Sequence, residues 1–135
     1  MFNSKWSNFL EESKEDSSRV AKIVLFDNEN KVLFLKRTDY VEKFKGEWDL
    51  PGGHAHVGED IIKALRREVR EETQLSFKTP EKIKQIDNIT FYKAKFDGGK
   101  IKLSKEHSEF LFRNVEKIKN PDKFERIAQE AIKND

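Results

Sequence analysis

The sequence predicts an α+β domain in which helices pack on a β-sheet, and three observations support this. Short runs of β-branched and aromatic residues recur along the chain, separated by turn residues such as Asp27-Asn28-Glu29-Asn30 and Asp97-Gly98-Gly99. A helical pattern without Gly or Pro covers residues 59–73. A second helical pattern begins after Asn120-Pro121-Asp122 and runs to about residue 133. Strands with a helix inserted among them and another at the end are typical of a layered α+β domain.

Strands are predicted on both sides of the central helix. The expected segments are residues 19–26, 31–35, a short strand around 48–50, strand-like segments within 77–96, and 109–115. The first two are separated by a turn and predict a hairpin. The short third strand is expected to stop at Pro51-Gly52-Gly53, because proline and glycine interrupt strands.

The remaining N-terminal segment differs in composition. Residues 1–19 are polar and mildly acidic, with Trp6, Phe9 and Leu10 at helical spacing. This pattern predicts a short amphipathic helix or a partly ordered arm, followed by a single domain over residues 20–135.

Length, charge and composition exclude several classes of protein. The chain has 135 residues, with 27 Lys and Arg against 25 Asp and Glu, and this balance argues against a specific nucleic-acid binder. It has no cysteine, which excludes disulfides, thiolate zinc sites and a cysteine nucleophile. The apolar runs are far shorter than the roughly 20 residues of a membrane-spanning helix. The N-terminus has no signal-peptide core, so we expect a cytoplasmic protein without a membrane partner.

The central helix carries three carboxylates along one edge of its apolar stripe. At about 100° per residue, Glu68, Glu71 and Glu72 border the stripe that contains Leu65 and Val69. Like charges at this spacing repel by about 0.2–0.5 kcal/mol per pair. Neighbouring arginines supply part of the counter-charge, but one guanidinium is not expected to bridge all three. A hard divalent cation such as Mg²⁺ or Mn²⁺ does so with oxygen ligands. The alternative is an ordinary solvated Glu/Arg helix surface.

A glycine pair precedes this helix. Gly52 and Gly53 follow the short strand and lead, through Gly58, to the helix N-terminus. Glycines allow a close approach of the backbone to a ligand, and a helix start favours anions. By itself this pattern is a weak indication of a phosphate-binding loop.

The loop and the helix together resemble the Nudix box, the signature of the Nudix (MutT-like) hydrolases. Gly53 is followed after five residues by Glu59, and after seven more by Arg67-Glu68-Val69-Arg70-Glu71-Glu72-Thr73-Gln74-Leu75. Every specified position of the family pattern is matched except one, where Gln74 replaces glycine. Glycine there suits a left-handed residue that ends a helix, and glutamine would carry a penalty of the order of 1 kcal/mol. The resemblance extends more loosely over residues 20–115 and implies an α/β/α sandwich around a mixed sheet.

The resemblance implies metal-dependent hydrolysis of a nucleoside diphosphate linked to another group. Glu71 and Glu72 would be the main metal ligands, with Glu68 and the backbone carbonyl of Gly53 completing the set. Arg67 and Glu59 would orient these carboxylates. The expected cofactor is Mg²⁺ or Mn²⁺.

Five further residues are candidates outside the box. Glu106 is the first candidate for an additional ligand or general base and Glu109 the second; the alternative is an ordinary charged loop. Arg37 lies where relatives often hold a substrate phosphate, with a solvated strand end as the alternative. His56 is a candidate substrate contact, as is the backbone of Gly52. A closed zinc site at His54 and His56 is disfavoured, because the chain has three His and no Cys.

The substrate is not specified by the box. A small single-domain chain most resembles the (d)NTP pyrophosphatases, acting on a small-molecule nucleotide as a monomer or homodimer. Tyr92 loosely resembles a tyrosine of diadenosine polyphosphate hydrolases, and hydrolysis of ADP-ribose or nucleotide sugars is a further alternative. A non-catalytic Nudix-fold regulator is the competing class. The intact acids Glu68, Glu71 and Glu72 argue against it.

Overall fold

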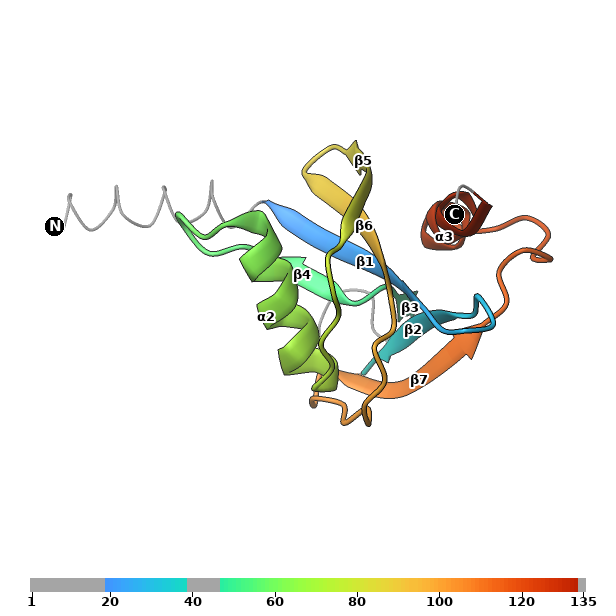
Figure 1. Ribbon diagram of the computed structural model, residues 1–135, viewed down its shortest axis with the longest axis horizontal. Coiled ribbons are helices and arrows are strands. Elements are labelled where there is room, and N and C mark those ends of the chain that lie inside the picture. The colour runs from blue at the N-terminus through green and yellow to red at the C-terminus, as the bar shows by residue number, and fades with distance from the viewer. Residues whose placement is uncertain (1–18, 39–46, 134–135) are drawn as a thin grey trace, which may run out of the picture.

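A seven-stranded mixed sheet with a helix on each face organises residues 19–38 and 47–133, the residues that the computed structural model describes (Figure 1). The predicted N-terminal arm, apart from Arg19, lies outside them. The strands are β1 (Val20–Phe26), β2 (Val32–Arg37), β3 (Trp48–Asp49), β4 (Gly52–His54), β5 (Glu81–Ile86), β6 (Ile89–Lys95) and β7 (His107–Arg113). The helices are α2 (Ile61–Thr73) and α3 (Lys123–Lys133).

The sheet order is β3-β2-β1-β6-β5, with β4 paired to β1 and β7 paired to β2. Strands β1 and β6 are parallel, and the other pairs are antiparallel. The expected α+β fold with a mixed sheet is therefore confirmed. Neither described helix is long and apolar enough to cross a membrane.

Strand β1 is buried on both faces because it lies between the two helices. Its residues Ala21, Ile23 and Leu25 belong to the core cluster that includes Leu65 and Val69 of α2. The intervening Val24 and Phe26 belong to a second cluster that includes Ile127, Ala128, Ala131 and Ile132 of α3. The period of two along a strand thus divides the core into two layers.

The short strand β3 ends at Asp49, before Pro51-Gly52-Gly53, as expected, but the new strand that begins at Gly52 was not predicted from the sequence. The chain continues into β4, where Ala21 pairs with Gly53 and Lys22 with Gly52. Gly52 has φ +130°, and a Cβ there would lie 2.0 Å from the Ala21 carbonyl oxygen. Glycine at this position therefore permits a close strand pairing rather than ending one.

Several element boundaries differ from the prediction. Helix α2 begins at Ile61, because the Asp60 side chain accepts from the N–H groups of Ile62 and Lys63 and makes Asp60 the N-cap. Glu59, which was expected in the first turn, therefore precedes the helix. Strand β7 begins two residues earlier than predicted. The strand-like segments expected within residues 77–96 are the strands β5 and β6.

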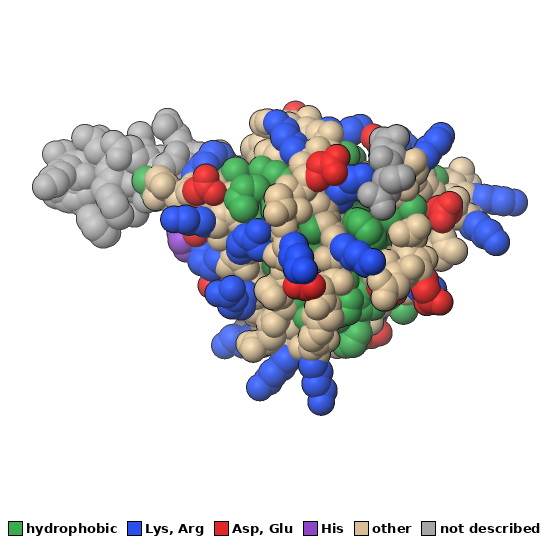
Figure 2. Space-filling model, in the orientation of Figure 1, with side chains coloured by type: hydrophobic (Ala, Val, Ile, Leu, Met, Phe, Trp, Pro, Cys, Tyr) green, Lys and Arg blue, Asp and Glu red, His purple; other side chains and the backbone are tan. Residues whose placement is uncertain are grey.

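The end of α2 has the geometry that the family glycine suggests. Gln74 has φ 67° and ψ 16°, in the left-handed region, and its N–H donates to the Arg70 carbonyl. On the face shown in Figure 2, Lys and Arg side chains predominate, with fewer Asp and Glu side chains among them.

Candidate active site

Helix α2 presents Glu68, Glu71 and Glu72, here called the carboxylate face, beside strand β4. The burial of Leu65 and Val69 against the sheet fixes the rotation of the helix. Glu68 and Glu72 consequently point toward the Gly52-Gly53 backbone, whereas Glu71 remains more exposed.

Glu72 is the most buried of the three carboxylates. Glu72 is 6% exposed, and its Oε1 accepts a hydrogen bond of 2.9 Å from the Gly52 N–H. Burial raises the pKa of Glu72 to about 8, while the positive charge of Lys22 and the Gly52 hydrogen bond oppose this rise. Glu72 is thus a carboxylate that lacks sufficient positive charge nearby.

Glu68 lies directly against Gly53. A Cβ at position 53 would be 2.5 Å from Glu68 Oε1, so the absence of a side chain there makes room for this carboxylate. Burial raises the pKa of Glu68, and the nearby Arg67 opposes the shift. The negative charges of Glu71 and Glu106 add to the rise.

Arg67 contacts three carboxylates at once but only two of the carboxylate face, in keeping with the expectation that one guanidinium does not bridge all three. Its Nε lies 3.0 Å from Glu59, and its Nη1 lies 3.0 Å from Glu68 and 3.3 Å from Glu71. Its Nη2 also donates to the His54 carbonyl. Hydrogen bonding to Arg67 lowers the pKa of Glu59 to about 2, and Glu59 raises the pKa of Arg67. Arg67 therefore neutralises Glu59 and part of the carboxylate face, but it makes no ion pair with Glu72.

The carboxylate face fits a hard divalent cation. Its donors are oxygens, and burial with a raised pKa leaves Glu68 and Glu72 short of positive charge. Within residues 19–38 and 47–133, no three His, Cys, Asp or Glu side chains are already gathered as metal ligands. Arg67 and the Gly52 N–H instead occupy oxygens of the face. Glu68, Glu72 and Glu71, with the Gly53 carbonyl, are the groups that could hold such an ion.

The loop before β7 brings Glu106 toward the carboxylate face. The Ser104 N–H donates to the Glu72 carbonyl at 3.1 Å, and the Glu106 N–H donates to Ser104 Oγ at 3.3 Å. The influence of Glu106 on the Glu68 pKa reflects this approach. Glu109 instead lies on β7, where it is exposed and pairs with Lys36 at 3.4 Å.

The three remaining candidates have different surroundings. The Gly52 N–H is used by Glu72, and the His56 N–H donates to Glu59 Oε1, so both backbones hold carboxylates of the protein itself. The His56 residue is exposed. Arg37 is not a solvated strand end, because its Nη1 lies 3.4 Å from Asp49 Oδ2 at the wall of a pocket.

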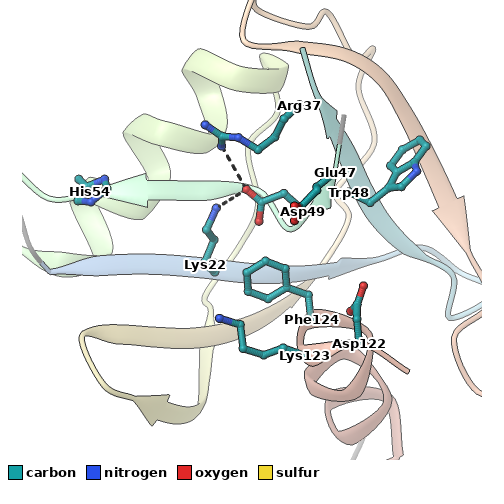
Figure 3. Close-up of a pocket in the computed structure, with 9 residues that line it drawn as sticks. All are labelled: Lys22, Arg37, Glu47, Trp48, Asp49, His54, Asp122, Lys123 and Phe124. Carbon is teal, nitrogen blue, oxygen red and sulfur yellow. Dashed lines mark hydrogen bonds and ion pairs between the residues drawn. The ribbon is translucent and has the colours of Figure 1, made fainter. Parts of the chain in front are cut away.

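This pocket, of about 410 Å³, lies on the α3 side of the sheet (Figure 3). Lys22, Arg37 and Asp49 form what we call the pocket floor, and Trp48 and Phe124 supply aromatic walls. Lys22 pairs in register with Gly52, whose N–H holds Glu72, so the pocket floor adjoins the carboxylate face.

Sequence reasoning missed Lys22 and Asp49. Lys22 is 9% exposed in a strand that is otherwise entirely apolar, and its Nζ lies 2.8 Å from Asp49 Oδ2. A lysine within a continuous apolar strand was the signal that could have identified it, because a buried lysine requires a partner.

Comparisons with known proteins agree with this geometry. The NUDIX domain model matches residues 16–131. An RNA pyrophosphohydrolase of Pelagibacter ubique is 40% identical over 70 residues, covering 52% of this chain and 41% of that protein. Nucleoside triphosphatase NudI of Salmonella agona is 48% identical over 48 residues, covering 36% of this chain and 34% of that protein.

These curated relatives are matched over less than half of their own length. Among solved structures, the MutT protein from Methanosarcina mazei Go1 superposes with a TM-score of 0.62 at 26% identity, covering 85% of this chain and 91% of that one. The fold, the box and the family model agree, and the chain belongs to the Nudix family.

Proposed function

We propose that the chain is a metal-dependent pyrophosphohydrolase that converts a nucleoside triphosphate to its monophosphate and pyrophosphate. The observation that carries this proposal is the complete carboxylate face of α2, held beside the Gly52-Gly53 backbone. A polyphosphate is strongly anionic, so a site built from carboxylates requires cations to bind it. A non-catalytic regulator would have no need for three acids at this edge.

The residues have distinct roles in this proposal. Glu68, Glu71, Glu72 and the Gly53 carbonyl would hold the cation, which when bound would neutralise the phosphates and favour attack by water at phosphorus. Arg67 keeps Glu68 and Glu71 in place through its 3.0 Å and 3.3 Å contacts. The Glu106 carboxylate would accept the proton of the attacking water. Glu109, already paired with Lys36, is the second candidate for that base.

The substrate class is supported by the pocket next to the carboxylate face. Its volume of about 410 Å³ and its two aromatic walls suit one nucleoside. One relative is named a nucleoside triphosphatase, which agrees with a triphosphate substrate. Dinucleoside polyphosphates, ADP-ribose and nucleotide sugars are the alternatives to be tested beside it.

The test is a panel of nucleotides incubated with Mg²⁺ or Mn²⁺, with separate detection of monophosphate, phosphate and pyrophosphate. We expect monophosphate and pyrophosphate in equal amounts from triphosphates, and no turnover after chelation. Glu71→Gln should lower this turnover, whereas Glu81→Gln, an exposed carboxylate at the start of β5, serves as the matched control. Turnover of only diadenosine polyphosphates or ADP-ribose would overturn the substrate assignment, and no metal-dependent turnover at all would overturn the proposed activity.

A further inference from the structure

Strand β7 lies at an edge of the sheet and carries exposed apolar side chains (Figure 1). Of the described strands, only β2 pairs with it. Phe110 is 46% exposed and the adjacent Leu111 is 45% exposed. Within residues 19–38 and 47–133, Val57 is the one other large apolar side chain with such exposure. A strand edge of this kind is a template for pairing with a further strand.

The edge formed by β5 differs in composition. Among the described strands, β5 pairs only with β6, and it carries Lys82 and Lys84. Lysines on an edge strand discourage pairing with another chain. Strand β7, with the sequence HSEFLFR, contains no lysine. Pairing is therefore discouraged at the β5 edge and left open at the β7 edge.

The backbone of β7 has hydrogen-bonding groups that face away from β2. The Lys31 carbonyl faces β1, because it accepts from the N–H of Asp27, directly after that strand. The next residue of β2 therefore directs its backbone to β7, where its partner is Arg113. Backbone directions alternate along a strand, so Phe110 and Phe112 direct their N–H and C=O groups to the free edge.

The sequence of β7 is complementary to itself in the antiparallel direction. If Leu111 lies opposite Leu111 of the partner subunit, Phe110 faces the partner's Phe112 and Glu109 faces the partner's Arg113. Opposite residues share a face of the sheet, so apolar side chains meet in the middle and opposite charges meet at both ends. Phe110 and Phe112 are also the two residues with outward backbone groups, and this register pairs those groups with one another.

The ion pairs within the chain leave capacity for these contacts. Glu109 is exposed, and its Oε2 lies 3.4 Å from Lys36. Arg113 uses its Nη1 for Glu125 at 2.6 Å. A carboxylate has a second oxygen and a guanidinium has further N–H donors, so each group accommodates one more partner. The charges of the edge are thus complementary to those of a second copy.

We propose that two copies of this chain associate through their β7 strands, antiparallel about a two-fold axis, with Leu111 opposite Leu111 of the partner subunit. The two sheets become one continuous sheet. Such an interface uses the same patch on both subunits, as two-fold symmetry requires. The inference does not depend on the proposed function, and its tests measure association alone.

The first test is cross-linking through a single introduced cysteine. The chain has no cysteine, so a disulfide can form only between two molecules. In the proposed register, Leu111→Cys places two thiols in a non-hydrogen-bonded pair with Cα atoms about 4.5 Å apart, within the range of a disulfide. Val57→Cys is the control, matched in exposure but located outside β7.

Under mild oxidation we expect Leu111→Cys to form a cross-linked dimer at least about tenfold faster than Val57→Cys, because pairing raises the effective concentration of its thiols. Equal rates would overturn the inference. Faster cross-linking of Phe110→Cys than of Leu111→Cys would overturn the proposed register.

The second test is sedimentation equilibrium over a series of protein concentrations. The parent should associate to a dimer. Leu111→Lys places like charges opposite each other at the centre of the interface and should raise the Kd of the dimer at least about tenfold. Val57→Lys should keep the parent value.

A parent that stays monomeric at every concentration would overturn the inference, as would an unchanged Kd in Leu111→Lys. If circular dichroism shows that Leu111→Lys is unfolded, the cysteine comparison decides alone. A monomer that hydrolyses nucleotides would overturn only this inference. A dimer without turnover would overturn only the proposed function.

Discussion

The carboxylate face of α2 and the pocket floor beside α3 both hold charged groups away from water, but their charge balance is opposite. On the carboxylate face, Glu72 is buried and Glu68 is partly buried close to other acids, and burial raises the pKa of both. On the pocket floor, Asp49 lies between the cations of Lys22 and Arg37. The first region lacks positive charge, and the second already contains it.

This difference indicates that the pocket floor stabilises the fold through its own ion pairs, whereas the carboxylate face is built to bind a cation. Buried like charges destabilise a fold, and a bound cation would relieve them. Removing one partner of a buried ion pair is strongly destabilising, because it leaves the other charge buried without a counter-charge. Mutations that remove a charge should therefore have opposite effects on stability in the two regions.

The largest expected effect is on activity at the carboxylate face. Glu72→Gln keeps the size of the side chain and an acceptor for the Gly52 N–H, but removes a ligand charge. Several kcal/mol of transition-state stabilisation should be lost, or about 10³-fold in kcat. Turnover at saturating Mg²⁺ measures the loss, with circular dichroism as the control for folding. Equal kcat in mutant and parent would contradict the role of Glu72.

On the pocket floor, Lys22→Met should destabilise the protein. It leaves Asp49 buried with only the more distant Arg37 as its cation. Removing one partner of a buried pair costs about 3–5 kcal/mol in the free energy of unfolding. Urea unfolding of the metal-free proteins measures this value. An unchanged urea midpoint would contradict this prediction. It would mean that water reaches the pair of Lys22 and Asp49 and screens its charges.

Two acids near the edge of the carboxylate face, Glu106 and Glu109, are candidates for the general base. Glu106→Gln should lower kcat by about 10²-fold with little change in KM, because it removes a proton acceptor. Glu109→Gln, which breaks an exposed pair with Lys36, should change kcat far less. The opposite result would exchange the two roles. If neither variant matters, the base lies within the carboxylate face, with Glu68 the first candidate.

The pH dependence of stability tests the charge deficit directly. The pKa of Glu72 lies at about 8 in the folded metal-free protein, above the ordinary 4.5. The folded state therefore binds a proton more tightly between these values, and stability falls as pH rises through this range. Glu72→Gln removes that loss and should raise the free energy of unfolding at pH 8 by up to about 4 kcal/mol.

Unfolding in the presence of a chelator, at pH 4.5 and pH 8, is the measurement. The gain of Glu72→Gln in the free energy of unfolding should vanish at pH 4.5. If Glu72→Gln is less stable than the parent at pH 8, ionisation of Glu72 does not destabilise the folded protein, and the prediction is contradicted.

The smallest expected effect concerns the end of α2. Gln74 has φ 67°, where a side chain is penalised and glycine is not. Gln74→Gly should therefore raise the free energy of unfolding by about 0.5–1 kcal/mol, after allowance for the entropy of glycine. Activity should change little. Thermal unfolding in one buffer measures the effect, and a lower melting temperature would mean that this helix ends differently in solution.

The carboxylate face could be predicted because its parts lie close together in the sequence. Residues 53–74 contain the glycine, the acids and the arginine, and helical spacing alone aligns Glu68 with Glu72. The conformation of Gln74 followed from the same pattern and is confirmed. The β4 strand was missed, because glycines usually interrupt strands and here permit close pairing with β1.

The pocket floor could not be predicted in the same way. Lys22, Arg37 and Asp49 come from three strands, and α3 adds Phe124 from far along the chain. Only the sheet order brings these residues together, and no local spacing encodes that order. The ion pair between Arg67 and Glu59 was not predicted for a related reason, because Glu59 precedes the helix and no helical spacing relates it to Arg67.

The most direct test of the account is the affinity of the carboxylate face for a divalent cation. Mn²⁺ binding is followed by electron paramagnetic resonance, with Mg²⁺ as competitor, for the parent, Glu72→Gln and the control Glu81→Gln. The account predicts one Mn²⁺ site that Mg²⁺ displaces, weakened at least about tenfold in Glu72→Gln and unchanged in Glu81→Gln. Equal Mn²⁺ affinity in all three proteins would contradict it.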